Sequence, residues 1–175
     1  MLGNSRERVS GLGGTLAVMS TSPAADCKVC ASLAGPQRQE PLFENDLWHV
    51  RHAAAPYGVP GWMLLLSRRH VSGPAHFDDR EAKSFGPTLR HLEKVLEQVT
   101  GALRIYTAAL GESSPHFHAH MVPRYASMPK DAKAWAVFDL ERAARSNEIS
   151  VDPAEVRRME DAYRRALASA PIPLL

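Results

Sequence analysis

Three histidines alternate with other residues in one short stretch of the 175-residue chain, where His116, His118 and His120 lie in the segment PHFHAHMVPR. Eight histidines placed at random in this chain would give roughly 0.02 triplets of that spacing, so we expect the pattern to have a cause. Alternate side chains of a β-strand share one face, and the segment therefore predicts a strand with all three imidazoles on one side. Such rings can bind a metal, or act as nucleophile and proton shuttle toward an anionic substrate. The alternative is the solvated polar face of an edge strand, although Lys, Thr or Glu would serve equally well there.

The residues between and after these histidines predict how the strand is placed. Phe117, Ala119 and Met121 are expected to point to the opposite face, into a core. Pro123 has no N–H to donate, and it is expected to end the strand.

A second group with chemical potential is the CxxC pair formed by the two cysteines of the chain, Cys27 and Cys30. Two thiolates at this spacing supply half of a tetrahedral zinc site, and the missing ligands would have to be histidines. A redox pair is an alternative, although the strand, CxxC and long helix of a thioredoxin-like protein are missing here. A pair of merely buried cysteines is another. One lone CxxC indicates a reducing compartment and hence a cytoplasmic protein.

Length and composition limit the class of protein. The chain carries 21 Lys+Arg against 19 Asp+Glu, and this balance argues against a partner that is a DNA or RNA polymer. No apolar run approaches the 18 residues needed for a membrane span. Residues 1–25 are rich in Gly and Ser and predict a disordered leader, while residues 26–175 are expected to form a single domain.

Several elements are expected to position these side chains. Residues 42–52 predict a hairpin around Asn45, residues 53–61 a loop, and residues 62–67 a buried strand. Asp78 and Glu81 predict a capping box that opens a helix reaching Thr100 and ending at Gly101. A strand is expected over 103–109 and an irregular segment over 126–151. A last helix is expected to begin at Asp152–Pro153, with Val156, Met159, Tyr163 and Leu167 as its apolar stripe.

Together these residues resemble the histidine triad (HIT) superfamily. PHFHAHMVPR is similar to the signature strand of that superfamily, in which three histidines alternate with apolar residues. Four other features agree in order and spacing. They are the CxxC, the segment FEND at 43–46, SRRH at 67–70 in the place of Pro-Lys-x-His, and Gly111-Glu112-Ser113 in the place of Gly-Gln-Ser/Thr. The resemblance covers roughly residues 27–125.

The resemblance implies an α+β fold, with an antiparallel sheet of about five strands, a long helix and a C-terminal helix packed on it. It also implies a homodimer and a nucleotide substrate, cleaved at the α-phosphate through a covalent nucleotidyl-histidine. The substrates of the diadenosine polyphosphate hydrolases and nucleoside phosphoramidases of this superfamily are the ones that the resemblance suggests. Some branches are nucleotidyl transferases or phosphorylases.

The resemblance also implies roles for individual residues, carried over by position. The middle histidine, His118, corresponds to the nucleophile, and His120 to the residue that contacts the phosphate and assists the leaving group. In zinc-bearing bacterial members two cysteines and two histidines hold a structural zinc, which implies a Cys₂His₂ site here. Those ligands would be Cys27, Cys30, His70 and His116, and the implied phosphate or nucleotide contacts are Ser113, Glu112, Gly111 and Asn45.

Besides the basic pair Arg68-Arg69 in place of a Pro-Lys pair, the sequence departs from the family pattern at three places. Glu112 replaces the usual glutamine, Trp62 replaces a histidine after Gly61, and residues 52–56 lack the acidic residue that contacts a ribose. These departures keep open a second hypothesis, a zinc-stabilised nucleotide-binding or scaffold module with little or no turnover. Trp48, Trp62 and Tyr57 could stack on a base, although packing in a core or interface is the favoured interpretation.

Overall fold

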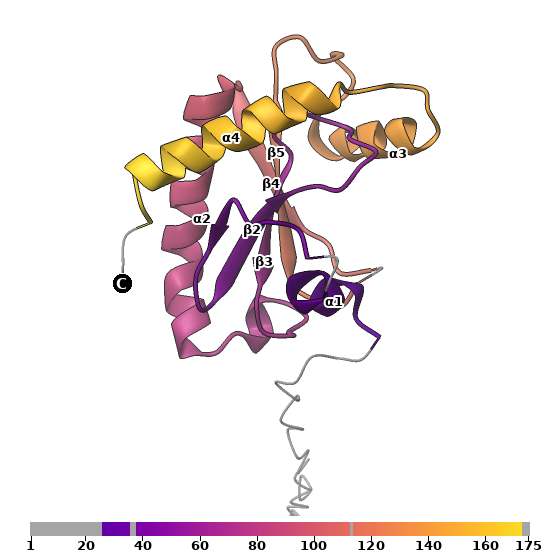
Figure 1. Cartoon of the computed structure of the whole chain (residues 1–175). Coiled ribbons are helices and arrows are strands. Elements are labelled where there is room, and N and C mark those ends of the chain that lie inside the picture. Colours follow the sequence, from indigo (N-terminus) through magenta and orange to yellow (C-terminus); the bar gives the residue numbers. More distant parts are fainter. Residues whose placement is uncertain (1–25, 36–37, 113, 173–175) are drawn as a thin grey trace, which may run out of the picture.

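A five-stranded antiparallel sheet forms the centre of the domain in the computed structural model, which describes residues 26–35, 38–112 and 114–172 (Figure 1). In spatial order β1-β2-β3-β5-β4, the strands are β1 (Phe43–Glu44), β2 (Trp48–His52), β3 (Met63–Ser67), β5 (His118–Arg124) and β4 (Arg104–Ala109). The helices are α1 (Lys28–Ala34), α2 (Asp79–Thr100), α3 (Asp139–Arg145) and α4 (Pro153–Ser169), with short 3₁₀ turns η1 (Pro74–His76) and η2 (Ala134–Phe138). The predicted α+β class is thereby confirmed. The expected leader over 1–25 lies outside the described residues.

The first hairpin is held by its turn residue. The Asn45 Oδ1 atom accepts hydrogen bonds from the backbone N–H groups of Leu47 and Trp48, at 2.9 and 2.8 Å. Such a side chain mimics a backbone turn, which is the reason that Asn favours these positions. The predicted hairpin is confirmed, with β1 and β2 paired antiparallel on either side of Asn45.

The long helix α2 begins and ends where its capping residues predict. The Asp78 carboxylate accepts from the Glu81 N–H at 2.9 Å, and the Glu81 carboxylate accepts from the Asp78 N–H at 2.8 Å, which completes the capping box. Gly101 ends the helix with φ of 63°, a left-handed conformation that glycine adopts without steric cost. The helix is continuous from Asp79 to Thr100 although Pro87 lies within it.

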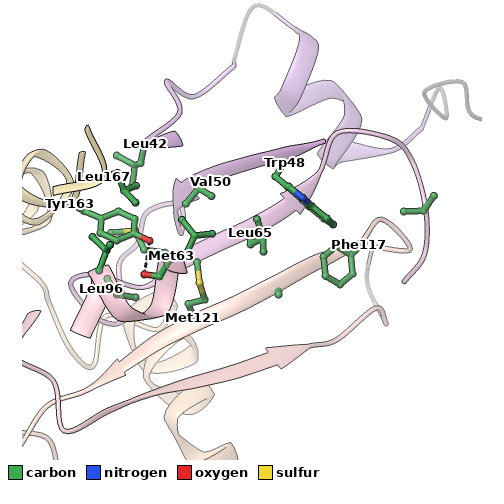
Figure 2. Close-up of a cluster of buried hydrophobic side chains, with 14 residues drawn as sticks. Leu42, Trp48, Val50, Met63, Leu65, Leu96, Phe117, Met121, Tyr163 and Leu167 are labelled. Carbon is green, nitrogen blue, oxygen red and sulfur yellow. Dashed lines mark hydrogen bonds between the residues drawn. The ribbon is translucent and has the colours of Figure 1, made fainter. Parts of the chain in front are cut away.

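One face of the sheet packs on α2 and α4 and forms the larger core (Figure 2). The α4 stripe contributes Tyr163, which is completely buried and donates from its hydroxyl to the Leu92 carbonyl of α2 at 3.0 Å. Trp48 is also completely buried here, with Phe77, Phe85 and Phe117 around it. None of the helices in the described part of the chain is both long and apolar enough to cross a bilayer.

The opposite face is covered by α1 and α3, which corrects the expectation of an irregular segment over 126–151 (Figure 1). Val137 of η2 is completely buried against this face, and Phe138 and Leu140 pack beside it. A Cβ atom on Gly58 would lie 2.8 Å from the backbone nitrogen of Glu141, so the loop before β3 accepts α3 only because this residue lacks a side chain. Tertiary packing of few apolar residues, rather than a sequence period, makes this segment helical.

The strand of the three histidines differs from the prediction at both ends. It begins at His118, so His116 precedes it. There Phe117 donates its N–H to the Val71 carbonyl and accepts from the Ser67 N–H, which directs this part of the chain away from the regular ladder. The strand also continues through Pro123, which lies opposite Ile105 of β4. The pairing of β3 with β5 stops at Met121, so Pro123 has a neighbouring strand on one side and a proline is tolerated.

Candidate metal centre and active site

Four side chains converge near the start of β5. Cys27 and Cys30 come from the first turn of α1, His70 from the loop after β3, and His116 from the residues before β5. One potential ligand atom of each lies within 4.8 Å of all the others, so the structure brings together the complete predicted metal set.

The distances within this cluster fit a tetrahedral zinc ion. The Nδ1 atom of His116 lies 3.6 Å from the Cys27 sulfur and 3.3 Å from the Cys30 sulfur, and His70 Nδ1 lies 3.4 Å from the Cys30 sulfur. Zn–S bonds near 2.3 Å and Zn–N bonds near 2.0 Å at a tetrahedral angle separate sulfur from nitrogen by about 3.5 Å. The residues therefore fit a zinc ion held by a Cys₂His₂ ligand set with no open coordination position.

The surroundings of the cluster prepare its donor atoms. His116 Nε2 donates to the Ser67 carbonyl at 2.7 Å, so a neutral ring leaves its Nδ1 lone pair directed at the sulfurs. The Cys30 N–H contacts the Cys27 sulfur at 3.5 Å across the first turn of α1, which holds the two thiols on one side. Two imidazoles beside both thiols favour metal binding over the alternative of a redox pair.

A cavity of about 450 Å³ lies next to this cluster, on the α1–α3 side of the sheet. It is lined by Val29, Arg51, Leu64, Leu66, Leu110, Glu112, Ser114, His118, His120, Phe138, Glu141 and Arg145. Strand β5 presents His118 and His120 to this cavity while Ala119 and Met121 point into the larger core, as the alternation predicts. The two histidine rings lie 5.1 Å apart, edge to face.

The hydrogen bond of His118 determines its tautomer. Its Nδ1 atom lies 2.8 Å from the backbone carbonyl of His116, and a carbonyl only accepts, so Nδ1 carries the proton. The lone pair of the neutral ring is therefore on Nε2. A nucleophilic histidine needs this arrangement, with one nitrogen held by an acceptor and the other unprotonated.

His120 has the opposite tautomer. The indole N–H of Trp62 donates to His120 Nδ1 at 3.0 Å, and that nitrogen must accept, so the proton of the neutral ring is on Nε2. Burial, followed by the charge of neighbouring His118, lowers the pKa of His120 to about 4. His120 is therefore a neutral hydrogen-bond donor in the physiological pH range.

The predicted nucleotide contacts are only partly brought together. Glu112 lines the cavity, and Gly111 is exposed beside it with open space around its Cα. Asn45 instead lies in the β1–β2 turn, where its side-chain oxygen is occupied, and it does not line the cavity. Ser113 falls outside the described residues. The nucleotide-binding role of all four residues stays a prediction.

Two of the three aromatic residues considered for base stacking, Trp48 and Trp62, instead pack in the interior, which was the favoured interpretation. Trp48 lies in the larger core, and Trp62 lies with 1% of its surface exposed beneath His120. Tyr57 contacts the His52 ring and does not line the cavity.

Three charged cavity residues were not predicted. Arg51 of β2 is placed there by register, since Arg51 is paired with Leu64 and Leu64 with His120 across the sheet. Glu141 and Arg145 of α3 form an ion pair at 2.5 Å. Their i, i+4 spacing was visible in the sequence, but it indicates a helix and not a site.

Comparison with protein families gives a match that includes the three histidines. A sequence model of the HIT domain matches residues 36–127, more than half of the chain. Nothing among curated proteins matches significantly.

Solved structures give the same relationship at the level of the fold. A hypothetical histidine triad nucleotide-binding protein of Sulfolobus tokodaii is 13% identical with a TM-score of 0.59, over 82% of this chain and 93% of its own. A Zn-bound histidine triad family protein of Mycobacterium smegmatis is 16% identical with a TM-score of 0.58, over 82% and 94%. A histidine triad protein of Bradyrhizobium japonicum is 21% identical with a TM-score of 0.58, over 73% and 89%. With three histidines at alternate positions and this domain match, the chain belongs to the histidine triad family.

Proposed function

We propose that the chain is a hydrolase or nucleotidyl transferase that cleaves at the α-phosphate of a dinucleoside polyphosphate or a nucleoside phosphoramidate. The observation that carries this proposal is the 2.8 Å contact between His118 Nδ1 and the His116 carbonyl. It leaves the unprotonated Nε2 of a ring that lines the cavity as the attacking atom.

The reaction would proceed in two steps. His118 Nε2 forms a bond to the α-phosphorus while the bond from phosphorus to the leaving group breaks, and the leaving group takes the electron pair. The ring becomes cationic, and the His116 carbonyl that accepts from Nδ1–H stabilises that charge. His120 donates from Nε2–H to a phosphate oxygen, where negative charge is concentrated. Water, or a second acceptor in a transferase, then forms a bond to phosphorus while the bond from phosphorus to His118 Nε2 breaks; the electron pair returns to His118, and the proton of the acceptor is released to solvent.

Zinc would be held by Cys27, Cys30, His70 and His116, and would supply a structural link between α1, the β3 loop and the start of β5. It has no part in the chemical steps, since four protein ligands complete its coordination. The homodimer, the single domain over 26–175 and the cytoplasmic location remain proposals of the same kind. The exposed Leu103 and Leu110 at the ends of edge strand β4 are compatible with a subunit contact there.

The test is to trap the intermediate. The zinc-loaded protein is incubated with nucleotide substrates labelled at the α-phosphate, and acid-labile label on the protein is measured for wild type and for His118→Ala. We expect label on the wild type alone. An unlabelled wild type that also fails to turn over adenine and guanine substrates would exclude the proposal.

A second candidate is a zinc-stabilised nucleotide-binding or scaffold module with little turnover. The position of Glu112 favours it, because a carboxylate lining the cavity opposes an anionic substrate. Nucleotide binding without label or turnover in the same experiment would distinguish this candidate from the enzyme.

A further inference from the structure

Trp62 lies immediately before β3, and its indole packs against the ring of His120, which lines the reaction cavity. With 1% of its surface exposed, it donates its N–H to His120 Nδ1 at 3.0 Å. We propose that Trp62 is a positioning residue, which holds His120 in the tautomer with the proton on Nε2 and directs that N–H toward the substrate phosphate. The inference rests on the proposed function for the substrate phosphate, whereas the tautomer of His120 can be measured independently of it.

An indole is suited to this role because its N–H donates and has no acceptor form. A second histidine at this position could either donate or accept, so that two tautomers of His120 would be compatible with it. Trp62 permits one neutral tautomer. The ring of His120 lines the cavity, and no hydrogen bond joins its Nε2 atom to any of the described residues, so this N–H is available to a ligand.

Aromatic packing fixes the plane of the indole. Phe138 packs edge to face against Trp62 with ring centroids 5.3 Å apart, and against His120 at the same distance. Trp62 and His120 are themselves 5.7 Å apart. Each of the three rings therefore packs against the other two, and this packing restricts the direction of the hydrogen bond.

The backbone before Trp62 is fixed as well. Gly61 has φ of +81°, and a Cβ atom there would lie 3.2 Å from both the Thr100 methyl and the Tyr125 hydroxyl. Its N–H donates to His52 Nε2 at 3.0 Å, and His52 Nδ1 in turn lies 2.8 Å from the Ala53 carbonyl. The residue that precedes the indole is therefore held from two sides, so Trp62 cannot easily move away from His120.

The charges around His120 agree with a neutral ring. His118 on the same strand and Arg51 on β2 disfavour a cation at His120, whereas Glu141 of α3, paired with Arg145, favours one. Glu112 also lines the cavity, while Trp62 and Phe138 contribute no charge. Burial is the largest effect, and together with His118 and Arg51 it outweighs Glu141, so the ring stays neutral and one nitrogen is free to accept the bond from Trp62.

The first measurement is the tautomer itself, read from long-range ¹H–¹⁵N NMR spectra of the zinc-loaded full chain labelled at histidine. We expect His120 of the wild type to carry its proton on Nε2 between pH 5 and 8. Trp62→Phe removes the donor and keeps an aromatic ring, and we expect it to produce a mixture of tautomers. A wild-type His120 with its proton on Nδ1 would overturn the proposal, as would a variant with an unchanged tautomer.

Trp48→Phe is a matched control. Trp48 is also buried, and its indole donates to the Ser84 hydroxyl at 3.0 Å, away from the cavity. Both variants lose an indole N–H and the same volume, but only Trp62→Phe is expected to change the His120 spectrum and to lower kcat, by about tenfold with KM nearly constant. Equal losses of kcat in the two variants would mean that Trp62 acts only through stability. Failure of the proposed function would instead appear as a wild type without label or turnover, while the spectra would still decide the role of Trp62.

Discussion

The metal cluster and the reaction cavity use two histidines, His116 and His118, that are close in the sequence. The two rings differ in what their second nitrogen faces. His116 has 1% of its surface exposed and both nitrogens directed, one at the Ser67 carbonyl and the other at the two sulfurs. His118, two residues later, has Nδ1 bound to a backbone carbonyl and its ring in the cavity wall.

The difference teaches that the residue type does not determine the role. Both rings have one nitrogen fixed by a main-chain oxygen, which selects the tautomer. What the second nitrogen meets, two thiols in one case and a cavity in the other, makes one a candidate ligand and the other a candidate nucleophile.

The largest effect should come from His118→Asn, which tests whether the two regions are separate. We expect kcat/KM to fall by roughly 10³-fold or more, because the attacking lone pair is lost. Zinc content and the melting temperature should remain close to wild type, since His118 is not part of the cluster. Activity and metal content by elemental analysis are measured, with the exposed His76→Asn as the matched control. Loss of zinc in His118→Asn would contradict the division between the regions.

Disruption of the metal cluster should have the next largest effect, and here we expect stability to be lost, whereas His118→Asn should lose activity and keep its stability. Cys30→Ser, or removal of zinc by a chelator, should lower the melting temperature by about 5–10 °C, since metal binding contributes to folding free energy. Calorimetry of zinc-loaded and metal-free protein checks this. A melting temperature that stays constant after verified removal would show that the cluster does not stabilise the fold.

Both regions could be predicted in outline because their signals are local. Capping residues such as Asp78 and Gly101 act within one helical turn, and the period of two in residues 118–121 survives folding because one face of the strand is buried. The Cys₂His₂ ligand set could be predicted because the family resemblance assigns the CxxC pair and two histidines of its motifs to one metal site.

The remaining part of the cavity could not be predicted because it depends on long-range packing. Helix α3 has no clear apolar period and is held by contacts such as Glu141 against Gly58, more than 80 positions apart in the chain. Arg51 reaches the cavity through a register across three strands. The role of Trp62 in the tautomer of His120 likewise requires coordinates, since a buried tryptophan is expected in any core.

A smaller effect is expected on the pH dependence of the free energy of unfolding, to which His120 of the cavity should contribute. The pKa of His120 is about 4 in the folded protein, below the usual 6.5, so below about pH 6.5 the unfolded chain binds a proton that the folded chain does not. The free energy of unfolding should therefore fall between pH 7 and 4, by about 2 kcal/mol more in wild type than in His120→Asn. Denaturant titrations of both zinc-loaded proteins measure the difference, in which acid effects on the shared metal ligands cancel. Parallel curves would indicate that His120 titrates normally.

The smallest expected effect concerns the charge of the cavity. Glu112→Gln removes an exposed carboxylate from the wall while the metal cluster stays as it is, and we expect KM for an anionic nucleotide to fall by about two- to fivefold with kcat nearly constant. The effect is small because solvent and salt screen an exposed charge, and it should shrink further as ionic strength rises. Glu97→Gln, an exposed residue of α2, makes the same change of net charge away from the cavity and should leave KM unchanged. If KM rose in Glu112→Gln, the carboxylate would be a contact that the substrate uses, and a leaving group with a positive charge would then be favoured over a polyphosphate.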